Sequence, residues 1–536
     1  MRFDPERYAY ASRRNTVYSK DGMCASASPL GSQIGAETLR KGGNAMDAAI
    51  AMATAMPLLE PTGNSLGSDC FVIAWMDGKL YGLDGSGVSP KSLSREAVLS
   101  RGLETVPVDG WLPVMVPGAP KAWAALRQRF GTLSMAELME PAIRYAEKGF
   151  PFPVTVLKEL RRDTEHFRVL AEQDPAVFGP WMDYYTRQGK AYEAGEIYRN
   201  PDMAKTLRKL AETDCETFYT GEVMRAIVAH SKKTGGFFSE EDFEEYEVRW
   251  VDPVSTDYHG YTVHEMPPNG HGITVLMALN ILKNRKLDPE RETARNYHEM
   301  IEAVKLAFAD TRKYVADPRF MQTRVEDLIS EEYAKKRSGL IGEDALTPVP
   351  GDPYCGGTVY FAAADKDGNM VSFIQSHFDR GSGVAIPGTG VSLQNRGAGF
   401  SMDPDSDNVL AGGKKSYHTI IPGFLTKDGK PVGPFGVMGG FMQPQGHLQV
   451  VLNTVDFHMN PQDCLDAPRF QWIGGKKVQL ERAVPAEIAE DLKRRGHEIE
   501  IVPDELDMGR GQIIWKLDGV YAGGTEPRAD GTIAVV

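Results

Sequence analysis

Residues 355–376 read CGGTVYFAAADKDGNMVSFIQS, and this stretch decides the fold. Two apolar, partly β-branched runs flank a Lys-Asp-Gly-Asn turn, which is the pattern of a β-hairpin whose first residue is Thr358. A three-residue loop at the turn would place Thr358 opposite Ser376, whereas a two-residue loop would place His377 there. In either register a polar side chain faces the threonine.

The residues around Thr358 suit a nucleophile. β-propensity alone explains a threonine at a strand start, but Gly356 and Gly357 allow backbone conformations closed to other residues. Such freedom suits a peptide bond that is attacked by the hydroxyl following it. Cleavage before Thr358 would leave a free α-amine with a pKa of about 8 beside the hydroxyl. One residue would then supply both the nucleophile and its base.

From Thr358 to Ser401 the sequence resembles the start of the small subunit of the gamma-glutamyltranspeptidase family. Those proteins are N-terminal-nucleophile hydrolases, made as one chain that cuts itself in front of a threonine. The resemblance covers nearly the whole chain and is carried by these segments: Gly42-Gly43-Asn44-Ala45-Met46-Asp47-Ala48-Ala49, Val116-Pro117-Gly118-Ala119-Pro120, Tyr261-Thr262-Val263-His264-Glu265-Met266-Pro267-Pro268, Gly381-Ser382-Gly383-Val384, Pro387-Gly388-Thr389-Gly390, Gln394-Asn395-Arg396, Val437-Met438-Gly439-Gly440 and Glu526-Pro527-Arg528-Ala529-Asp530-Gly531.

Helical sequence around antiparallel hairpins predicts an α+β protein, layered as a helix–sheet–sheet–helix sandwich. The resemblance implies the same four-layer αββα fold of the Ntn hydrolases. It also implies cleavage between Gly357 and Thr358. The products would be a mostly helical large subunit with outer strands, residues 1–357, and a small subunit, residues 358–536, that carries the nucleophile. The two subunits would remain partners, and the sequence leaves open whether such pairs form a homodimer.

Composition and charge bear on the partners and the location of the protein. Hydrophobic residues make up 42% and charged residues 25% of the chain, as in ordinary globular proteins. The net charge of −13 and the lack of a Lys/Arg-rich block argue against a nucleic-acid partner. Residues 1–8 lack the apolar core of a secretory signal, and no run approaches the roughly 18 apolar residues of a membrane helix. A cytoplasmic protein without a membrane partner is therefore expected.

Several local patterns bear on cofactors and on other enzyme classes. The five cysteines are scattered, without a C-x-x-C pair, so neither structural disulfides nor a zinc site is expected. His298 and Glu299 begin no H-E-x-x-H motif, because residue 302 is Glu. Residues 63–67 match the G-x-S-x-G elbow formally, but a helix is predicted before them and a strand after, the reverse of an elbow. The proposed chemistry needs no cofactor.

Three further expectations concern local structure. Gly31 to Lys41 and Ala45 to Met56 read as two helices, the second buried on all sides and ended by Pro57. From about Leu340 to Gly357 the composition turns to Pro and Gly, which predicts an exposed connection leading to the cleavage point.

The resemblance implies the catalytic groups that would serve Thr358. Acyl transfer produces a tetrahedral oxyanion, which needs hydrogen-bond donors. Gly439 and Gly440 stand where the family offers backbone N–H groups to it, although a plain turn would also explain two glycines. Ser376 matches a hydroxyl residue that orients the threonine in relatives; a surface serine on a strand is the alternative.

The specificity pocket departs from that of the true gamma-glutamyl enzymes, which clamp the α-carboxylate with an arginine and the α-amine with an acidic residue. Ser86 stands in place of the arginine and Gly399 in place of the acid. A paired serine motif is replaced by His418 and Thr419, and an asparagine by Phe378. Losing the arginine removes a bidentate, charge-assisted contact, so efficient glutathione cleavage is not expected.

Arg396 is a new positive charge near the place where the amino acid head would have bound. A site with one cation and no acid suits a small carboxylate-bearing amide, unless Arg396 is a salt-bridged scaffold residue. The segment from Arg396 to Gly399 is most similar to the intracellular, oxamate-amidohydrolase-like branch of the family.

These residues predict an amidohydrolase that acts on an oxamate-like small amide through an acyl-Thr358 intermediate. A gamma-glutamyltransferase or glutathione hydrolase and a cephalosporin-type acylase are the alternatives within the family. An uncleaved protein that only binds small amino or keto acids is the alternative from another class.

Overall fold

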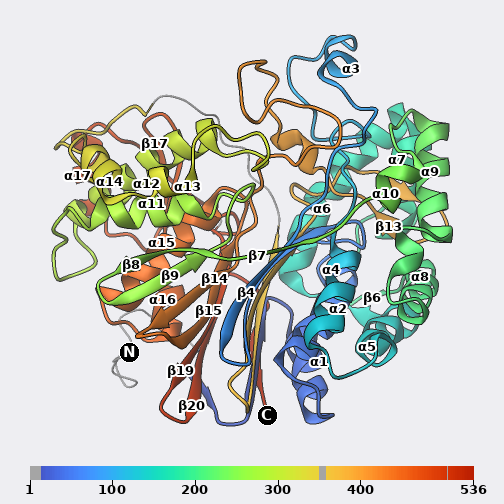
Figure 1. Ribbon diagram of the computed structural model, residues 1–536, viewed down its shortest axis with the longest axis horizontal. Coiled ribbons are helices and arrows are strands. Elements are labelled where there is room, and N and C mark those ends of the chain that lie inside the picture. Colours follow the sequence, from blue (N-terminus) through green and yellow to red (C-terminus); the bar gives the residue numbers. More distant parts are fainter. Residues whose placement is uncertain (1–13, 349–357, 504) are drawn as a thin grey trace.

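The computed structural model describes residues 14–348, 358–503 and 505–536. Two seven-stranded sheets with antiparallel neighbours pack against each other at its centre, and helices cover both outer faces (Figure 1). Sheet 1 has the order β1 (Val17–Ser19), β20 (Val520–Thr525), β19 (Arg510–Leu517), β15 (Lys430–Met438), β14 (Gly423–Lys427), β9 (Tyr261–Glu265) and β8 (Val254–Tyr258). Sheet 2 has the order β21 (Thr532–Val535), β2 (Gly22–Ser26), β10 (Val359–Asp365), β11 (Met370–Ser376), β3 (Asp69–Met76), β4 (Lys79–Gly85) and β7 (Arg249–Val251).

Each sheet has its own helical layer, so the predicted α+β class is confirmed (Figure 1). Sheet 1 is covered by α11 (Ile273–Leu282), α15 (Met442–Val455) and α16 (Pro461–Asp466), with α12 (Ala294–Tyr314) packed on α11. Sheet 2 is covered by α1 (Pro29–Arg40), α2 (Ala45–Leu59) and α4 (Ala119–Phe130), with α5 (Met135–Lys148) packed on α2. Among the described residues, no helix has the length and apolar character needed to span a bilayer.

The other elements connect or flank these layers. They are α3 (Arg95–Leu99), β5 (Phe150–Pro151), α6 (Val154–Gln173), α7 (Pro175–Tyr185), β6 (Ile197–Tyr198), α8 (Pro201–Glu212), η1 (Glu216–Phe218), α9 (Glu222–Thr234), α10 (Glu240–Glu244), α13 (Val325–Leu328), α14 (Glu331–Ser338), β12 (Ala385–Ile386), β13 (Val391–Ser392), η2 (Arg396–Gly399), β16 (Phe470–Gly474), β17 (Lys477–Leu480), α17 (Ala486–Arg494) and β18 (Glu498–Ile501).

The predicted hairpin forms the centre of sheet 2. Val359 pairs with Gln375 across β10 and β11, so the register is that of the three-residue loop and directs Thr358 toward Ser376. Every residue of both strands is buried, because β10 also pairs with β2, β11 pairs with β3, and α2 lies over them. The strand itself begins at Val359, one residue later than expected. The hairpin thus fixes Thr358 at the end of a rigid, buried strand.

Helix α2 is buried along its whole length, as expected, but Pro57 does not end it. The helix continues to Leu59, although a proline cannot donate to the carbonyl four residues earlier. That carbonyl, of Ala53, instead accepts a hydrogen bond from Gln375 Nε2 at 3.3 Å. A long-range contact from β11 therefore replaces the helical bond that Pro57 removes.

The connection before the cleavage point is not fully exposed, contrary to expectation. Within its described part, residues 340–348, the side chains of Ile341 and Ala345 are buried. The N–H of Ala345 donates to the carbonyl of Arg495 at 2.7 Å. Gly356 and Gly357, like the peptide bond before Thr358, lie outside the described residues. The connection is therefore anchored to the body of the protein before it approaches the nucleophile.

Candidate active site

The predicted nucleophile and its predicted orienting residue lie together. Thr358 is 1% exposed, and its Oγ1 donates a hydrogen bond to Ser376 Oγ at 3.2 Å. Ser376 Oγ also accepts from the N–H of Phe378 at 2.8 Å. Gln443 Nε2, in the first turn of α15, donates to Thr358 Oγ1 at 3.3 Å. The hydroxyl is therefore positioned from two sides, by the end of β11 and by the start of α15.

Gly63 brings a second segment of backbone against the nucleophile. A Cβ atom at Gly63 would lie 3.2 Å from the carbonyl carbon and oxygen of Thr358, so no larger residue fits without a shift. The Gly63 carbonyl accepts from the N–H of His377 at 3.2 Å, and Asn64 Nδ2 donates to the Gln375 carbonyl at 3.1 Å. The G-x-S-x-G stretch is no elbow, since α2 precedes it and β3 follows it. It nevertheless forms a wall of the site, which the sequence analysis missed.

The Gly439–Gly440 pair lies between the end of β15 and the start of α15. Both glycines have positive φ, +131° and +56°, a conformation that glycine adopts without a Cβ clash. A Cβ at Gly439 would also lie 3.2 Å from Gly509 Cα. N–H groups just before and within the first turn of a helix have no intrahelical partner and suit an anion. Gln443 of the same turn contacts Thr358, so the pair lies on a segment that reaches the nucleophile, and its role in binding an oxyanion stays a prediction.

Arg396, predicted to bind substrate, is 1% exposed at the start of η2. Its Nη1 donates to Thr419 Oγ1 at 2.7 Å, and its guanidinium carbon lies 4.7 Å from the ring centroid of Phe378. Among the described residues, its Nε and Nη2 have no hydrogen-bond partner. Burial lowers the pKa of Arg396 to about 9, an effect that the Asp69 carboxylate opposes. The structure thus brings two predicted pocket residues, Thr419 and Phe378, against the predicted cation Arg396, which stays charged at neutral pH.

Asp69 is the main residue of the site that sequence reasoning missed. It opens β3 opposite Ser376, and its Oδ2 lies 3.0 Å from His418 Nε2 and 3.9 Å from Arg396 Nε. Burial raises the pKa of Asp69 to about 7, although Arg396 acts in the opposite direction. Burial and the Arg396 charge hold the pKa of His418 well below its usual value, so this imidazole is neutral and can donate to Asp69. An acidic residue opening an apolar strand was the available signal.

Among the described residues, the Ser86 hydroxyl makes no hydrogen bond to Asp69, His418 or Arg396. Its Oγ donates to Asp84 Oδ1 at 2.6 Å and to Asn269 Oδ1 at 3.3 Å. Burial disfavours the charge on Asp84, but the cations of Lys415 and Arg249 outweigh it and lower the pKa of Asp84 to about 2. The serine that replaces the family's arginine is therefore committed to a buried salt-bridge network, and its role in substrate binding stays a prediction.

A cavity of about 230 Å³ opens beside Gly439. Its wall includes Thr62 and the ion pair between Arg510 and Glu159, whose closest atoms are 2.6 Å apart. Arg380 also lines it, with its Nε 3.5 Å from Asp163 Oδ1. The lining is charged with both signs, so the cavity suits a small polar group bound next to Gly439.

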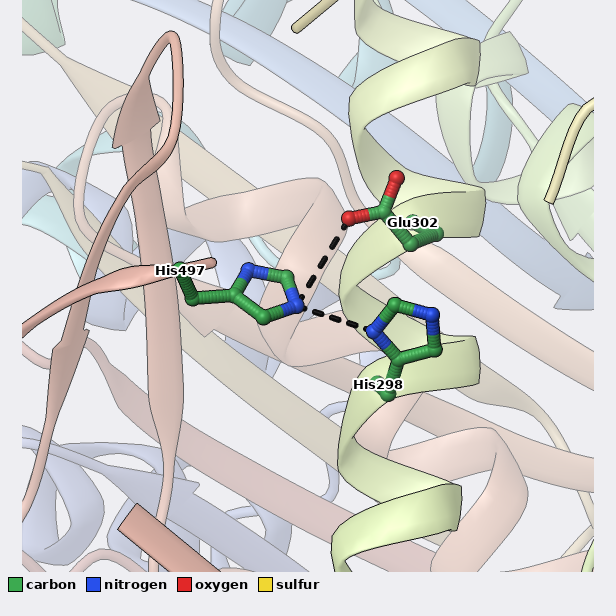
Figure 2. Close-up of side chains that lie close together, drawn as sticks. All are labelled: His298, Glu302 and His497. Atoms are coloured by element: carbon green, nitrogen blue, oxygen red, sulfur yellow. Dashed lines mark hydrogen bonds and ion pairs between the residues drawn. The ribbon is translucent and has the colours of Figure 1, made fainter. Parts of the chain in front are cut away.

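One group of side chains offers donors suitable for a metal. Figure 2 shows His298 and Glu302 of α12 pointing toward His497, and their ligand atoms all lie within 4.8 Å of one another. Lys305 Nζ, however, lies 2.7 Å from Glu302 Oε1 and 3.4 Å from His497 Nδ1. Because an ammonium group already neutralises the carboxylate, we interpret the four side chains as a hydrogen-bonded chain and assign no metal to them.

The fold and this site were compared with known proteins. The family description "Gamma-glutamyltranspeptidase" matches residues 31–536. A glutathione hydrolase-like proenzyme (YwrD) of Bacillus subtilis is 36% identical over 531 residues, covering 96% of this chain and 98% of that protein. An oxamate amidohydrolase proenzyme of Klebsiella pneumoniae is 31% identical over 534 residues, covering 96% and 98%. The crystal structure of a cephalosporin acylase from Bacillus halodurans has 53% identity and a TM-score of 0.95, covering 100% of this chain and 99% of that one.

Two sandwiched sheets with a buried threonine at the end of a central strand define the class as an N-terminal-nucleophile hydrolase. Within that class, the chain belongs to the gamma-glutamyltranspeptidase family. It is therefore an enzyme, and the alternative of a protein that only binds small molecules is not retained.

Proposed function

We propose that the chain cleaves itself between Gly357 and Thr358 and then hydrolyses small amides whose acyl part carries a carboxylate. The observation that supports this substrate class best is Arg396, a buried cation whose Nε and Nη2 have no hydrogen-bond partner among the described residues. Its guanidinium lies over Phe378, whose N–H donates to Ser376, the residue that accepts from Thr358. A carboxylate bound by Arg396 would therefore hold an adjoining amide close to the nucleophile.

In self-cleavage, the Thr358 hydroxyl would attack the Gly357 carbonyl, forming an ester as the peptide nitrogen leaves. The hydroxyl proton passes to this nitrogen, which becomes the free α-amine of Thr358. Water then hydrolyses the ester, which releases the Gly357 carboxylate and restores the Thr358 hydroxyl. In the mature enzyme this amine accepts the hydroxyl proton while Oγ1 attacks the substrate carbonyl. The N–H groups of Gly439 and Gly440 stabilise the oxyanion, the Thr358 ammonium protonates the leaving amine, and water releases the acyl group as an acid.

A cephalosporin-type acylase is a second candidate, supported by the 53% identity to a structure bearing that description. An acyl group that ends in a carboxylate would also satisfy Arg396. A gamma-glutamyl substrate fits less well, because no acidic residue stands at Gly399 to bind its α-amine. Cleaved protein should be assayed with oxamate, glutaryl-7-aminocephalosporanic acid and gamma-glutamyl-p-nitroanilide. Faster turnover of the gamma-glutamyl amide than of both others would refute the proposed substrate class.

Asp69 makes a pH dependence of substrate binding expected. Below its pKa of about 7 the carboxyl is protonated and leaves Arg396 free for a substrate carboxylate. Above that pH an ionised Asp69 competes for the same cation. KM for a carboxylate-bearing amide is therefore expected to rise with pH, by at most about tenfold between pH 6 and 8 if binding requires one proton on Asp69. Steady-state kinetics across this range measure the rise.

Asp69→Asn is the matched variant for this prediction, because it keeps the shape but cannot ionise. It should make KM nearly independent of pH between 6 and 8 while kcat still follows the Thr358 amine. An uncharged amide assayed with the wild-type enzyme serves as the second control. A KM rise that persists in Asp69→Asn would assign the titration to another group; Lys415 and Asp84 interact electrostatically with Asp69, and His418 with Arg396.

A further inference from the structure

The buried chain of Lys305, Glu302, His497 and His298 holds residues 342–346, which we call the arm. His298 Nε2 lies 2.9 Å from the Gly342 carbonyl oxygen. The N–H of Leu346 donates to Glu302 Oε2 at 3.2 Å, and Lys305 Nζ donates to the Leu346 carbonyl at 3.1 Å. All four side chains are buried. The arm is therefore fixed at both ends by groups that no step of the proposed reaction uses.

The hydrogen bonds of this chain are mutually consistent. His298 Nε2 faces a carbonyl oxygen and must donate, so its Nδ1 accepts from His497 Nε2 at 2.9 Å. His497 Nδ1 is then the acceptor that faces Lys305. Burial, followed by the nearby Lys305 cation, lowers the pKa of His497 to about 3, so the ring remains neutral at working pH. Each of these four side chains thus has a hydrogen-bond partner, which favours one defined geometry of the group.

This group of four hydrogen-bonded side chains also joins segments from the two sides of the proposed cleavage point. His298, Glu302, Lys305 and the arm precede Thr358, whereas His497 and Arg495 follow it. Arg495 adds three contacts to the arm: its carbonyl accepts from Ala345 at 2.7 Å, and its Nη1 donates to the Glu343 carbonyl at 3.2 Å and to Glu343 Oε2 at 2.9 Å. The arm thus lies between the two future subunits.

We propose that this chain of side chains is a positioning device for self-cleavage, which fixes the arm so that the scissile carbonyl meets the Thr358 hydroxyl in a reactive orientation. The inference rests on the proposed self-cleavage. Leu346 precedes Thr358 by 12 positions in the sequence. Misplacing reacting groups by about 1 Å can slow a reaction by about 10²-fold.

Two variants weaken the contacts that anchor the arm to α12. Lys305→Met removes the ammonium that bridges Glu302 and the arm, and Glu302→Gln keeps the shape but removes the charge. Arg285→Met is the matched control. It breaks a 2.6 Å ion pair with Glu299 of α12, and among the described residues Arg285 has no hydrogen bond to the arm, only an electrostatic interaction with Glu343. Freshly purified precursor is followed over time by intact mass spectrometry.

We expect Lys305→Met to slow self-cleavage by more than twofold relative to Arg285→Met, with Glu302→Gln intermediate. Turnover per cleaved chain should be unchanged in all three variants, a separation that a general loss of stability would not produce. In the wild type, hydrogen exchange should show protected amides at Ala345 and Leu346.

Four outcomes would overturn this role. Cleavage of both anchor variants at the control's rate, or unprotected amides at Ala345 and Leu346 in the wild type, would show that the arm is not a positioning element. Equimolar zinc that is lost in His497→Ala would show that a metal organises the group. A wild-type precursor that is never cleaved would refute the proposed function itself, which distinguishes this outcome from the other three.

Discussion

Thr358→Ala is expected to remain one chain with the full mass of 59.0 kDa and to lose amide hydrolysis by at least about 10³-fold. The substitution removes the hydroxyl that would attack both the Gly357 carbonyl and the substrate. Without cleavage the α-amine that serves as the base never forms, so the two functions are lost together. Intact mass spectrometry after long incubation, paired with an amide hydrolysis assay, measures both.

Two controls make this result specific. Thr358→Ser keeps a hydroxyl within reach of Ser376 and Gln443 and should still cleave, only more slowly. Ser65→Ala removes another fully buried hydroxyl, which contacts Ser68 Oγ at 3.4 Å and not Thr358, and should cleave at the wild-type rate. A cleaved Thr358→Ala product would show that the nucleophile has been misplaced. An intact Ser65→Ala chain would return attention to the G-x-S-x-G motif.

Local pattern was sufficient to predict the hairpin and the place of Thr358 within it. The alternation of apolar runs around a short polar turn restricts the pairing to two registers, and the observed one sets Val359 against Gln375. The same register places Ser376 opposite Thr358, whereas the orienting role of Ser376 and the oxyanion role of the Gly439–Gly440 pair came from the family resemblance. From local pattern alone, Ser376 could equally be a surface serine on a strand, and Gly439–Gly440 could equally be a plain turn.

Residues far apart in the sequence could not be brought together by such reasoning. Asp69 and His418 are separated by 349 positions, and nothing in either segment indicates that the two side chains meet. Pro57 was predicted to end α2, because nothing near it reveals that Gln375 supplies the missing hydrogen bond. His298 and Glu302 were seen only as a failed H-E-x-x-H motif, whereas their partner His497 lies 199 positions from His298.

Arg396→Ala is expected to raise KM for a carboxylate-bearing amide by about 10- to 150-fold, the equivalent of one lost hydrogen-bonded charge contact of 1.5–3 kcal/mol. Self-cleavage should proceed at the wild-type rate, because Arg396 contacts Thr419, Phe378 and Asp69 but makes no hydrogen bond to Thr358. The fold should tolerate the change, since Asp69 can take up a proton when its counter-charge is removed: its pKa is already about 7. Steady-state kinetics and intact mass spectrometry on the same preparation measure both quantities.

The conservative variant Arg396→Lys separates charge from geometry. It keeps a cation but loses the planar fork and most of the contact with the Phe378 ring, so KM should lie between those of the wild type and Arg396→Ala. If Nε and Nη2 of Arg396 bind the substrate carboxylate, the KM for an uncharged amide should change in neither variant. If Arg396 were instead a scaffold residue, both variants would slow self-cleavage as much as turnover, for charged and uncharged amides alike. The ratio of the two losses therefore decides whether this buried cation recognises substrate or only supports the fold.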